Sequence, residues 1–296
     1  MDREKTARLN VVLSMFIYGT IGLFVRYIPL PSSVIALARG VIGSLFLVLV
    51  LLLRRTWLSW SAIRAVLPRL CATGAMLGFN WILLFESYRY TTVATATLCY
   101  YMAPIILVAL SPFVFKERMS LRKLLCVLAA LLGMVFVSGV AKGGLPAAGE
   151  LRGVFLALCA AVLYALIVIS NKKLNGLSAY ERTIMQLIIS AIVLLPYDAL
   201  TGAFTGLVLS PRTLLLLVTV GVVHTGVAYY LYFGAVEHLK SQTLAILSYI
   251  DPVVAVLLSA LILHEPLGLL GALGAVLILG AALICELPEK EKAKPS

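Results

Sequence analysis

Long apolar runs, separated by short polar segments, form the dominant pattern along the chain. A membrane-spanning helix needs about 20 predominantly apolar residues. The pattern therefore predicts an all-α integral membrane protein with ten transmembrane helices, and an even number of spans places both ends of the chain on one side of the membrane. The predicted helices lie near residues 9–29, 32–53, 70–89, 92–115, 121–141, 151–171, 179–197, 212–236, 242–263 and 267–285.

The composition agrees with this class. The chain is 62% hydrophobic and 12% charged, with a mean hydropathy of +1.05, which excludes an ordinary soluble protein. The net charge of +11 comes from Lys and Arg in the short segments between apolar runs, so it reflects membrane topology rather than a nucleic-acid surface. The five cysteines lie in or at the ends of apolar runs and are expected to be free. No small-residue cleavage site follows the first apolar segment, so the first helix is expected to remain as an uncleaved anchor.

The basic residues predict which side of the membrane is cytoplasmic. Apart from Arg39, which lies within a span, most of the 24 Lys and Arg residues fall on the side of the N-terminus. Because cytoplasmic loops carry the excess of basic residues, we expect a multi-pass protein of the bacterial inner (plasma) membrane, with cytoplasmic N- and C-termini. The basic residues on the opposite side are Arg26, Arg89, Lys142, Arg152 and Arg212.

Two segments resemble each other when the sequence is shifted by 148 residues. FESYRYTTVATATLCYYMAPIILVALSPFVFKE then aligns with FGAVEHLKSQTLAILSYIDPVVAVLLSALILHE without a gap. Similar composition would account for matched Leu and Val but not for matched Pro, Tyr, Ser and Glu, so the sequence predicts a true repeat. The matches are Phe85/Phe233, Thr95/Thr243, Tyr101/Tyr249, Pro104/Pro252, Val108/Val256, Leu110/Leu258, Ser111/Ser259 and Glu117/Glu265.

The repeat divides the chain into two halves of five helices. We expect a first repeat at residues 1–141, a linker at 142–150, a second repeat at 151–286 and a cytoplasmic tail at 287–296. Because five is an odd number, the second half must enter the membrane from the opposite side. Inverted repeats of this kind are typical of secondary transporters, which bind their substrates near the midplane between the halves.

Several of these segments resemble a known family. They are YGTIGLFVR, Arg39 within ALARG, and the paired units YTTVATATLCYYMAPIILVALSPFVFKE and SYIDPVVAVLLSALILHEPLG. Together they resemble the ten-helix, EamA-type branch of the drug/metabolite transporter superfamily, over about residues 10–285. The resemblance implies a transporter in which helices one to four and six to nine surround a central cavity, with the fifth and tenth outside it. The family carries very different solutes, so the resemblance does not identify the cargo.

The last predicted helix carries a stripe of small residues, Gly268, Gly271, Gly274 and Ala275. Such stripes allow membrane helices to pack closely. The contact could lie within one chain or between two copies, so both a monomer and a homodimer remain open.

The stretch SYIDPVV, residues 248–254, places an acid and a proline side by side within an apolar run. Pro252 leaves the carbonyl of Ser248 without its helical donor, and a carboxylate in hydrocarbon is costly unless it is paired or hydrated. The repeat partner of Asp251 is Ala103, so the acid occurs in one half only. Asp251 is expected either to face the cavity, where it would bind a cation or a proton, or to be a capped structural residue beside a kink.

Two further charges lie within predicted spans. Arg39 and Glu86 have similar depths in neighbouring helices, and we expect them to pair because either charge alone would be costly. The pair could hold two helices together, or Arg39 could contact an anionic solute. Arg26 and Arg89 lie at the rim of the membrane, where we expect their side chains to reach lipid headgroups.

Aromatic and polar side chains within the spans complete the candidate site. Buried tyrosine hydroxyls need hydrogen-bond partners, and ring faces receive cations. The same rings could instead pack helices together or anchor them at the membrane interface. His224 lies at about the depth of Asp251 and could exchange a proton with it. The candidate substrate-binding residues are Tyr18, Arg39, Asn80, Trp81, Glu86, Tyr101, Tyr164, His224, Tyr230, Tyr249 and Asp251.

No sequence motif indicates an enzyme, since GxxxxGK[ST], HExxH and GxSxG are absent. No metal site or cofactor is expected. Because no nucleotide-hydrolysis motif is present, transport would draw on ion gradients, with protons as a candidate coupling ion. The sequence favours a secondary active transporter of small molecules that works by alternating access, an exporter of amino acids or related amphipathic compounds. Two alternatives remain, namely uptake of a cationic or quaternary ammonium solute, and a membrane scaffold or receptor without turnover.

Overall fold

The computed structural model describes residues 3–115, 119–138, 140, 147–172, 174, 176–236, 238–265 and 267–287, and these residues form helices and loops without strands. Most of the predicted linker and tail, and also Glu117, lie outside the described residues. In chain order the helices are α1 (Arg3–Arg26), α2 (Ser32–Leu53), α3 (Trp60–Tyr90), α4 (Val93–Tyr100), α5 (Ala103–Phe115), α6 (Leu121–Val137), α7 (Ala148–Asn171), α8 (Ala179–Leu200), α9 (Pro211–Gly221), the π-helix η2 (Val222–Val227), α10 (Ala228–Val236), α11 (Ser241–Ser248), α12 (Ile250–Leu261) and α13 (Gly268–Glu286).

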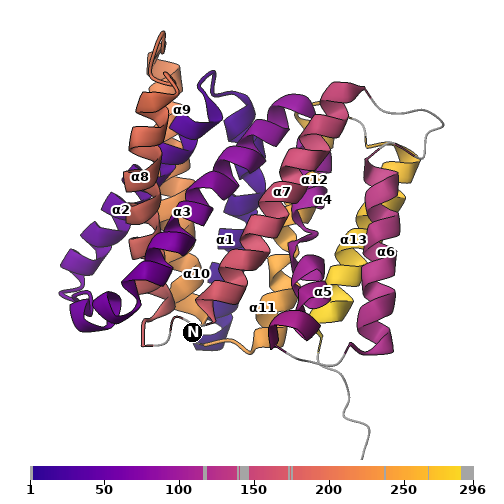
Figure 1. Ribbon diagram of the computed structural model, residues 1–296, viewed down its shortest axis with the longest axis horizontal. Coiled ribbons are helices and arrows are strands. Elements are labelled where there is room, and N and C mark those ends of the chain that lie inside the picture. Colours follow the sequence, from indigo (N-terminus) through magenta and orange to yellow (C-terminus); the bar gives the residue numbers. More distant parts are fainter. Residues whose placement is uncertain are drawn as a thin grey trace, which may run out of the picture.

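The helices form a bundle in which α1 begins and α13 ends at the same end (Figure 1). We call this the N-terminal end and the other the opposite end. Within the described residues, 8 helical segments are long and apolar enough to cross a membrane, whereas α6, with 17 residues, and the apolar stretch Ile246–Leu261 of α11 and α12 are shorter. Exposed Leu45, Leu128 and Leu269 illustrate the apolar outer surface, which suits hydrocarbon rather than water. The protein is therefore a multi-pass membrane protein.

Three of the predicted helices are interrupted. The helix predicted near 92–115 is divided into α4 and α5, the one near 242–263 into α11 and α12, and the one near 212–236 by the π-helix η2. Pro104 and Pro252 lie in the first turns of α5 and α12, where a missing N–H removes no helical hydrogen bond. Proline therefore explains two of the three interruptions.

One helix begins earlier than predicted. The span predicted near 70–89 belongs to α3, which begins at Trp60. Arg64 and Arg69 make its first part too polar to be recognised as a membrane span, although charge alone does not prevent a helix. Pro68 also lies within this part.

The outermost pair of helices, α6 and α13, lie side by side at one edge of the bundle (Figure 1). A Cβ atom added to Gly274 would lie 2.5 Å from the carbonyl oxygen of Gly133, so the two backbones touch where neither residue has a side chain. The small-residue stripe of the last helix thus makes its close contact within the chain. Gly268 and Gly271 take no part in this contact.

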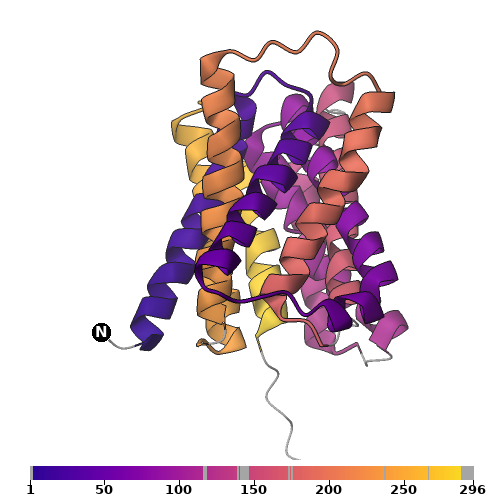
Figure 2. The same cartoon turned by 90° about the vertical axis from the view of Figure 1, so that its left-hand side faces the viewer.

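The remaining helices enclose the interior. Helix α2 packs against α8 and α9 (Figure 2), α3 packs against α7, and α1 packs against α10 and α12. Because α1 and α2 contact helices of the second half, side chains from both halves meet inside the bundle.

Candidate functional site

Two helix breaks lie against each other inside the bundle. Helix α4 ends just before Tyr101 and α11 ends just before Tyr249, at positions that match in the repeat. The centroids of the two rings are 6.1 Å apart. Helix ends leave backbone groups without internal partners, so the two breaks concentrate polar groups in one place.

Asp251 lies at the second break, in the first turn of α12. Its Oδ2 accepts a hydrogen bond of 2.8 Å from the hydroxyl of Tyr101. The same hydroxyl is 3.4 Å from the carbonyl oxygen of Ser248, the carbonyl that Pro252 leaves without a helical donor. Tyr101 therefore contacts both polar groups of the SYIDPVV stretch, the Asp251 carboxylate and the Ser248 carbonyl. The carboxylate also lies near the positive end of the α12 dipole.

Arg39 projects from α2 into the bundle and is buried. Its guanidinium carbon lies 4.1 Å from the ring centroid of Trp81 and 5.8 Å from that of Phe85. Its Nε donates a hydrogen bond of 2.8 Å to the hydroxyl of Thr225 on η2. Stacking and this single bond fix the plane of the guanidinium. Within the described part of the chain, no ion pair and no other hydrogen bond engages Arg39.

Arg39 and Asp251 line the same internal cavity, whose volume is about 320 Å³. A second cavity of about 510 Å³ adjoins it and also includes Asp251 in its wall. Lys172 and Arg182, which line the second cavity, come from the end of α7 and the start of α8 at the N-terminal end of the bundle (Figure 1). The two cavities thus extend from the N-terminal end to the helix breaks. The residues that line both are Tyr18, Leu77, Tyr101, Tyr164, Tyr229, Ser248 and Asp251.

Tyrosine pairs form much of the cavity wall. The rings of Tyr18 and Tyr229 are 5.7 Å apart, and those of Tyr100 and Tyr164 are 5.6 Å apart. Such walls offer apolar ring faces together with hydroxyl groups. They suit a solute that carries both apolar and polar groups.

Among the predicted site residues, those that line the first cavity are Tyr18, Arg39, Trp81, Tyr101, Tyr164 and Asp251. The predicted set leaves out other polar residues of this wall. The repeat register points to one of them, because Tyr229 is the partner of the predicted Trp81. The wall residues outside the predicted set are Tyr88, Thr97, Tyr100, Tyr229 and Ser248.

The predicted ion pair between Arg39 and Glu86 is wrong. Glu86 instead accepts a hydrogen bond of 2.7 Å from Ser32 and lies 3.7 Å from Arg89, one turn away on the same helix. Glu86 thus contacts the first residue of α2, whereas Arg39 lies about two turns further along α2, beside Trp81 and Thr225. The two charges therefore differ in depth, which the predicted helix boundaries are too coarse to resolve.

The expectation that His224 faces the site is also wrong. His224 is buried within η2 and lines neither cavity. Its Nε2 is 2.8 Å from the hydroxyl of Thr20, its Nδ1 is 3.4 Å from the carbonyl oxygen of Thr219, and its ring packs on Phe24. The π-turn changes the direction of its side chain relative to a regular helix. His224 therefore connects α1 to η2 beside the cavity.

Three other candidates lie outside the cavity lining. Asn80 is fully buried and donates a hydrogen bond of 2.6 Å to the carbonyl oxygen of Ala160, and its side-chain oxygen accepts from Tyr100. Tyr230 accepts a hydrogen bond of 2.8 Å from Arg54, away from the cavities. Tyr249 packs beside Tyr101 without lining either cavity. Asn80 and Tyr249 thus contact residues of the wall.

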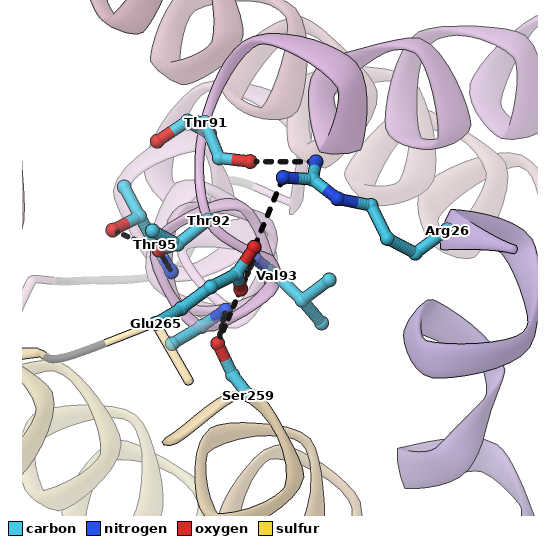
Figure 3. A network of polar contacts seen from close by, with 8 residues as sticks. Arg26, Thr91, Thr92, Val93, Thr95, Ser259 and Glu265 are labelled. Carbon is cyan, nitrogen blue, oxygen red and sulfur yellow. Dashed lines mark hydrogen bonds and ion pairs between the residues drawn. The ribbon is translucent and has the colours of Figure 1, made fainter. Parts of the chain in front are cut away.

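Arg26 and Arg89, which were expected to reach lipid headgroups, instead contact other parts of the protein. Arg26, the last residue of α1, lies 3.1 Å from Glu265 in the loop between α12 and α13 (Figure 3). Arg89 donates a hydrogen bond to the carbonyl oxygen of Leu30 and lies beside Glu86. Both arginines therefore connect segments at the opposite end of the bundle.

Comparison with known proteins agrees with this architecture. The EamA-like transporter family matches residues 5–139 and again residues 151–286, which together are most of the chain. The chain belongs to the EamA-like transporter family. Solute carrier family 35 also matches, over residues 75–205.

Relatives of this EamA-like chain have similar lengths. The uncharacterized transporter YxxF of Bacillus subtilis is 30% identical, over 98% of this chain and 93% of the relative. An uncharacterized transporter of Archaeoglobus fulgidus is 27% identical, over 93% of this chain and 94% of the relative. A solved crystal structure superposes with a TM-score of 0.64 at 21% identity, covering 95% of this chain and 96% of the other, which supports the fold.

Membership in the EamA-like family makes the chain a transporter rather than an enzyme. Its partners are accordingly a small-molecule substrate and the lipid bilayer.

Proposed function

We propose that the chain is a secondary active transporter that exports amino acids or related amphipathic compounds by alternating access. The main support for this proposal is that Arg39 and Asp251 line a single cavity of about 320 Å³. A guanidinium suits a carboxylate, and a carboxylate suits an ammonium group. The tyrosine rings of the same cavity wall suit an apolar side chain. One solute with both charges and an apolar part would satisfy all three.

Tyr18 supports a polar ligand in this cavity. Its hydroxyl is buried and, among the described residues, has no hydrogen-bond partner. Buried polar groups in native proteins are almost always hydrogen-bonded. A solute with a carboxylate or an amine would supply the partner. The substrate-binding residues we propose are those of the predicted set that line the cavity, Tyr18, Arg39, Trp81, Tyr101, Tyr164 and Asp251.

The architecture we propose has ten spans arranged as two inverted five-helix repeats. The 8 long segments would be completed by α6 and by the broken helix α11–α12. The first repeat would be residues 1–141 and the second 151–286, joined by a linker at 142–150 and followed by a tail at 287–296. The matched breaks at Tyr101 and Tyr249 support this arrangement.

In the cell, the N-terminal end of the bundle would face the cytoplasm of a bacterium, with the spans in the inner membrane. The excess of basic residues on that side supports this orientation. Protons are the coupling ion we propose, with Asp251 as their carrier, because it is the acid that lines both cavities. A monomer is the simpler assembly, since the close contact of Gly274 lies within the chain.

One alternative substrate has an observation of its own. Tyrosine rings beside a carboxylate also suit a quaternary ammonium ion, and Tyr101 and Tyr18 line both cavities with Asp251. Uptake of such a cation would leave Arg39 as a buried like charge in the same cavity, which disfavours binding. The amphipathic zwitterion therefore fits the whole lining better.

Purified protein in proteoliposomes tests the proposal, with labelled leucine and phenylalanine as zwitterionic probes and choline as the cationic probe. Flux of an amino acid that depends on an imposed pH gradient, without choline flux, is the expected result. Choline flux alone would replace the amino-acid proposal with the cationic alternative. Thermal stabilisation by a probe without any flux would instead indicate a receptor without turnover.

A further inference from the structure

A network of polar contacts joins three separate segments at the opposite end of the bundle (Figure 3). Glu265 lies in the loop between α12 and α13, Arg26 is the last residue of α1, and Val93 is the first residue of α4. The Oε1 atom of Glu265 lies 3.1 Å from Arg26. Its Oε2 atom accepts hydrogen bonds of 2.9 Å from the backbone N–H of Val93 and 2.6 Å from the hydroxyl of Ser259.

This arrangement is unlike a surface ion pair. Only 12% of the Glu265 side chain is exposed, compared with 37% for Arg26. Each carboxylate oxygen is engaged, and charge-assisted bonds of this kind are stronger than neutral ones. Arg26 also approaches the carbonyl oxygen of Thr91, so it contacts the corner between α3 and α4 as well. The network therefore connects parts of both halves of the chain.

The connected helices are those that line the cavity. Gly22, one turn before Arg26 on α1, belongs to the cavity wall, as do Thr97 on α4 and Asp251 on α12. The contacts of Glu265 thus hold together the ends of three cavity-lining helices. Toward the N-terminal end, by contrast, the second cavity lies between α1, α7, α8 and α10.

The repeat places a second cation at the corresponding position. Arg26 follows Tyr18 by the same number of residues as Lys172 follows Tyr164. Lys172 lines the cavity at the N-terminal end, whereas Arg26 is bound to Glu265 at the opposite end. Equivalent cations therefore lie at the two ends of the cavity system in different environments.

We propose that Arg26 and Glu265 form a gate that holds the cavity closed at the opposite end and must separate for the transporter to open there. The inference rests on the proposed alternating access. Separation would free α1 from α12 and from the start of α4, whereas the bonds of Glu265 to Val93 and Ser259 use its other oxygen and do not depend on Arg26. In this gate Glu265 positions the ends of α1, α4 and α12 and does not itself contact the solute.

The test measures access to the cavity from the opposite end. Ala255, a small residue of the cavity wall on α12, is replaced by cysteine, and its labelling by a membrane-impermeant maleimide is followed in vesicles with the opposite end outside. The protein without the added cysteine supplies the background from its native cysteines. Adding Glu265→Gln should raise the labelling rate about tenfold if the ion pair favours the closed state by about 1.4 kcal/mol.

Glu86→Gln is the matched control. Glu86 is also an acid at this end of the bundle and also contacts an arginine and a serine, but its arginine, Arg89, belongs to the same helix. Glu86→Gln should leave the labelling rate as in the parent. Equal labelling in the two variants would overturn the gate.

Arg26→Gln provides a second route, because it removes the ion pair while Glu265 keeps its bonds to Val93 and Ser259. It should raise labelling in the same direction even if Glu265→Gln folds poorly, and unchanged labelling in Arg26→Gln would overturn the gate. Increased labelling in a protein that transports none of the probes would retain the gate and reject the proposed function. Unchanged labelling in a protein that transports amino acids would reject the gate and retain the proposed function.

Discussion

Tyr101 and Asp251 connect the two halves of the chain by a hydrogen bond of 2.8 Å between their helix breaks. The donor lies at the break between α4 and α5, and the acceptor lies in the first turn of α12. A displacement of one half against the other must change this bond, because the two residues belong to helices on either side of it. The acid that lines the cavity is thus joined to the backbone geometry of both breaks.

Replacing Asp251 by Asn should abolish or strongly reduce flux while leaving the fold intact. The amide keeps the shape and can still accept from Tyr101, and the matched helix of the first half has Ala103 at this place without losing its break. Flux in proteoliposomes between about pH 5 and pH 8 is compared with the elution profile of the purified protein. Flux equal to that of the parent at every pH would make Asp251 a structural residue.

Replacing Arg39 by Lys should weaken binding of a zwitterionic solute by roughly tenfold or more, since a lysine retains the charge but neither the stacking nor the fixed donor plane. The loss follows from the 4.1 Å contact with Trp81 and the bond to Thr225. Concentration-dependent thermal shifts with leucine measure it. An unchanged affinity in a folded Arg39→Lys protein would remove Arg39 from the proposed site.

Tyr18→Phe and Tyr230→Phe should have opposite effects. The Tyr18 hydroxyl is buried and has no hydrogen-bond partner among the described residues, so its removal should reduce transport without lowering stability. The Tyr230 hydroxyl accepts from Arg54 away from the cavities, so its removal should lower stability by at most about 1 kcal/mol and leave transport per folded protein unchanged. Thermal unfolding and flux are measured on both proteins. The reverse pattern would contradict the assignment.

Gly274→Ala should destabilise the protein by about 1–3 kcal/mol, because the new methyl group would lie 2.5 Å from the carbonyl oxygen of Gly133. Gly280→Ala, on the same helix, is the control, since an added Cβ there meets nothing within 4 Å. Thermal unfolding in detergent compares the two variants. Equal stability would mean that α6 and α13 can separate without cost.

Hydrophobicity and proline chemistry act locally along the chain. They therefore predict the positions of helices and of helix breaks. Apolar runs located the helices, and Pro252 predicted the break beside Asp251 because the missing N–H acts within one turn. Which residue a side chain contacts depends on how neighbouring helices are aligned and turned, and approximate helix boundaries do not determine this, so Arg39 contacts Trp81 and Thr225 rather than Glu86. The residues of η2 carry no sequence signal for a π-helix. The direction of the His224 side chain therefore does not follow from its estimated depth in the membrane. The sequence marks Glu265 only as a match in the repeat, because its partner Arg26 lies far away in the chain.

The contact between Gly133 and Gly274 also has a consequence for the order of events during synthesis. Helix α6 emerges from the ribosome well before α13, which is the last helix of the described chain. Until α13 arrives, the glycine face of α6 has only lipid or other early helices against it, and its final neighbour does not yet exist. This edge of the bundle therefore forms only after α13 has been synthesised, and a chain that ends before α13 leaves the glycine face of α6 without its partner.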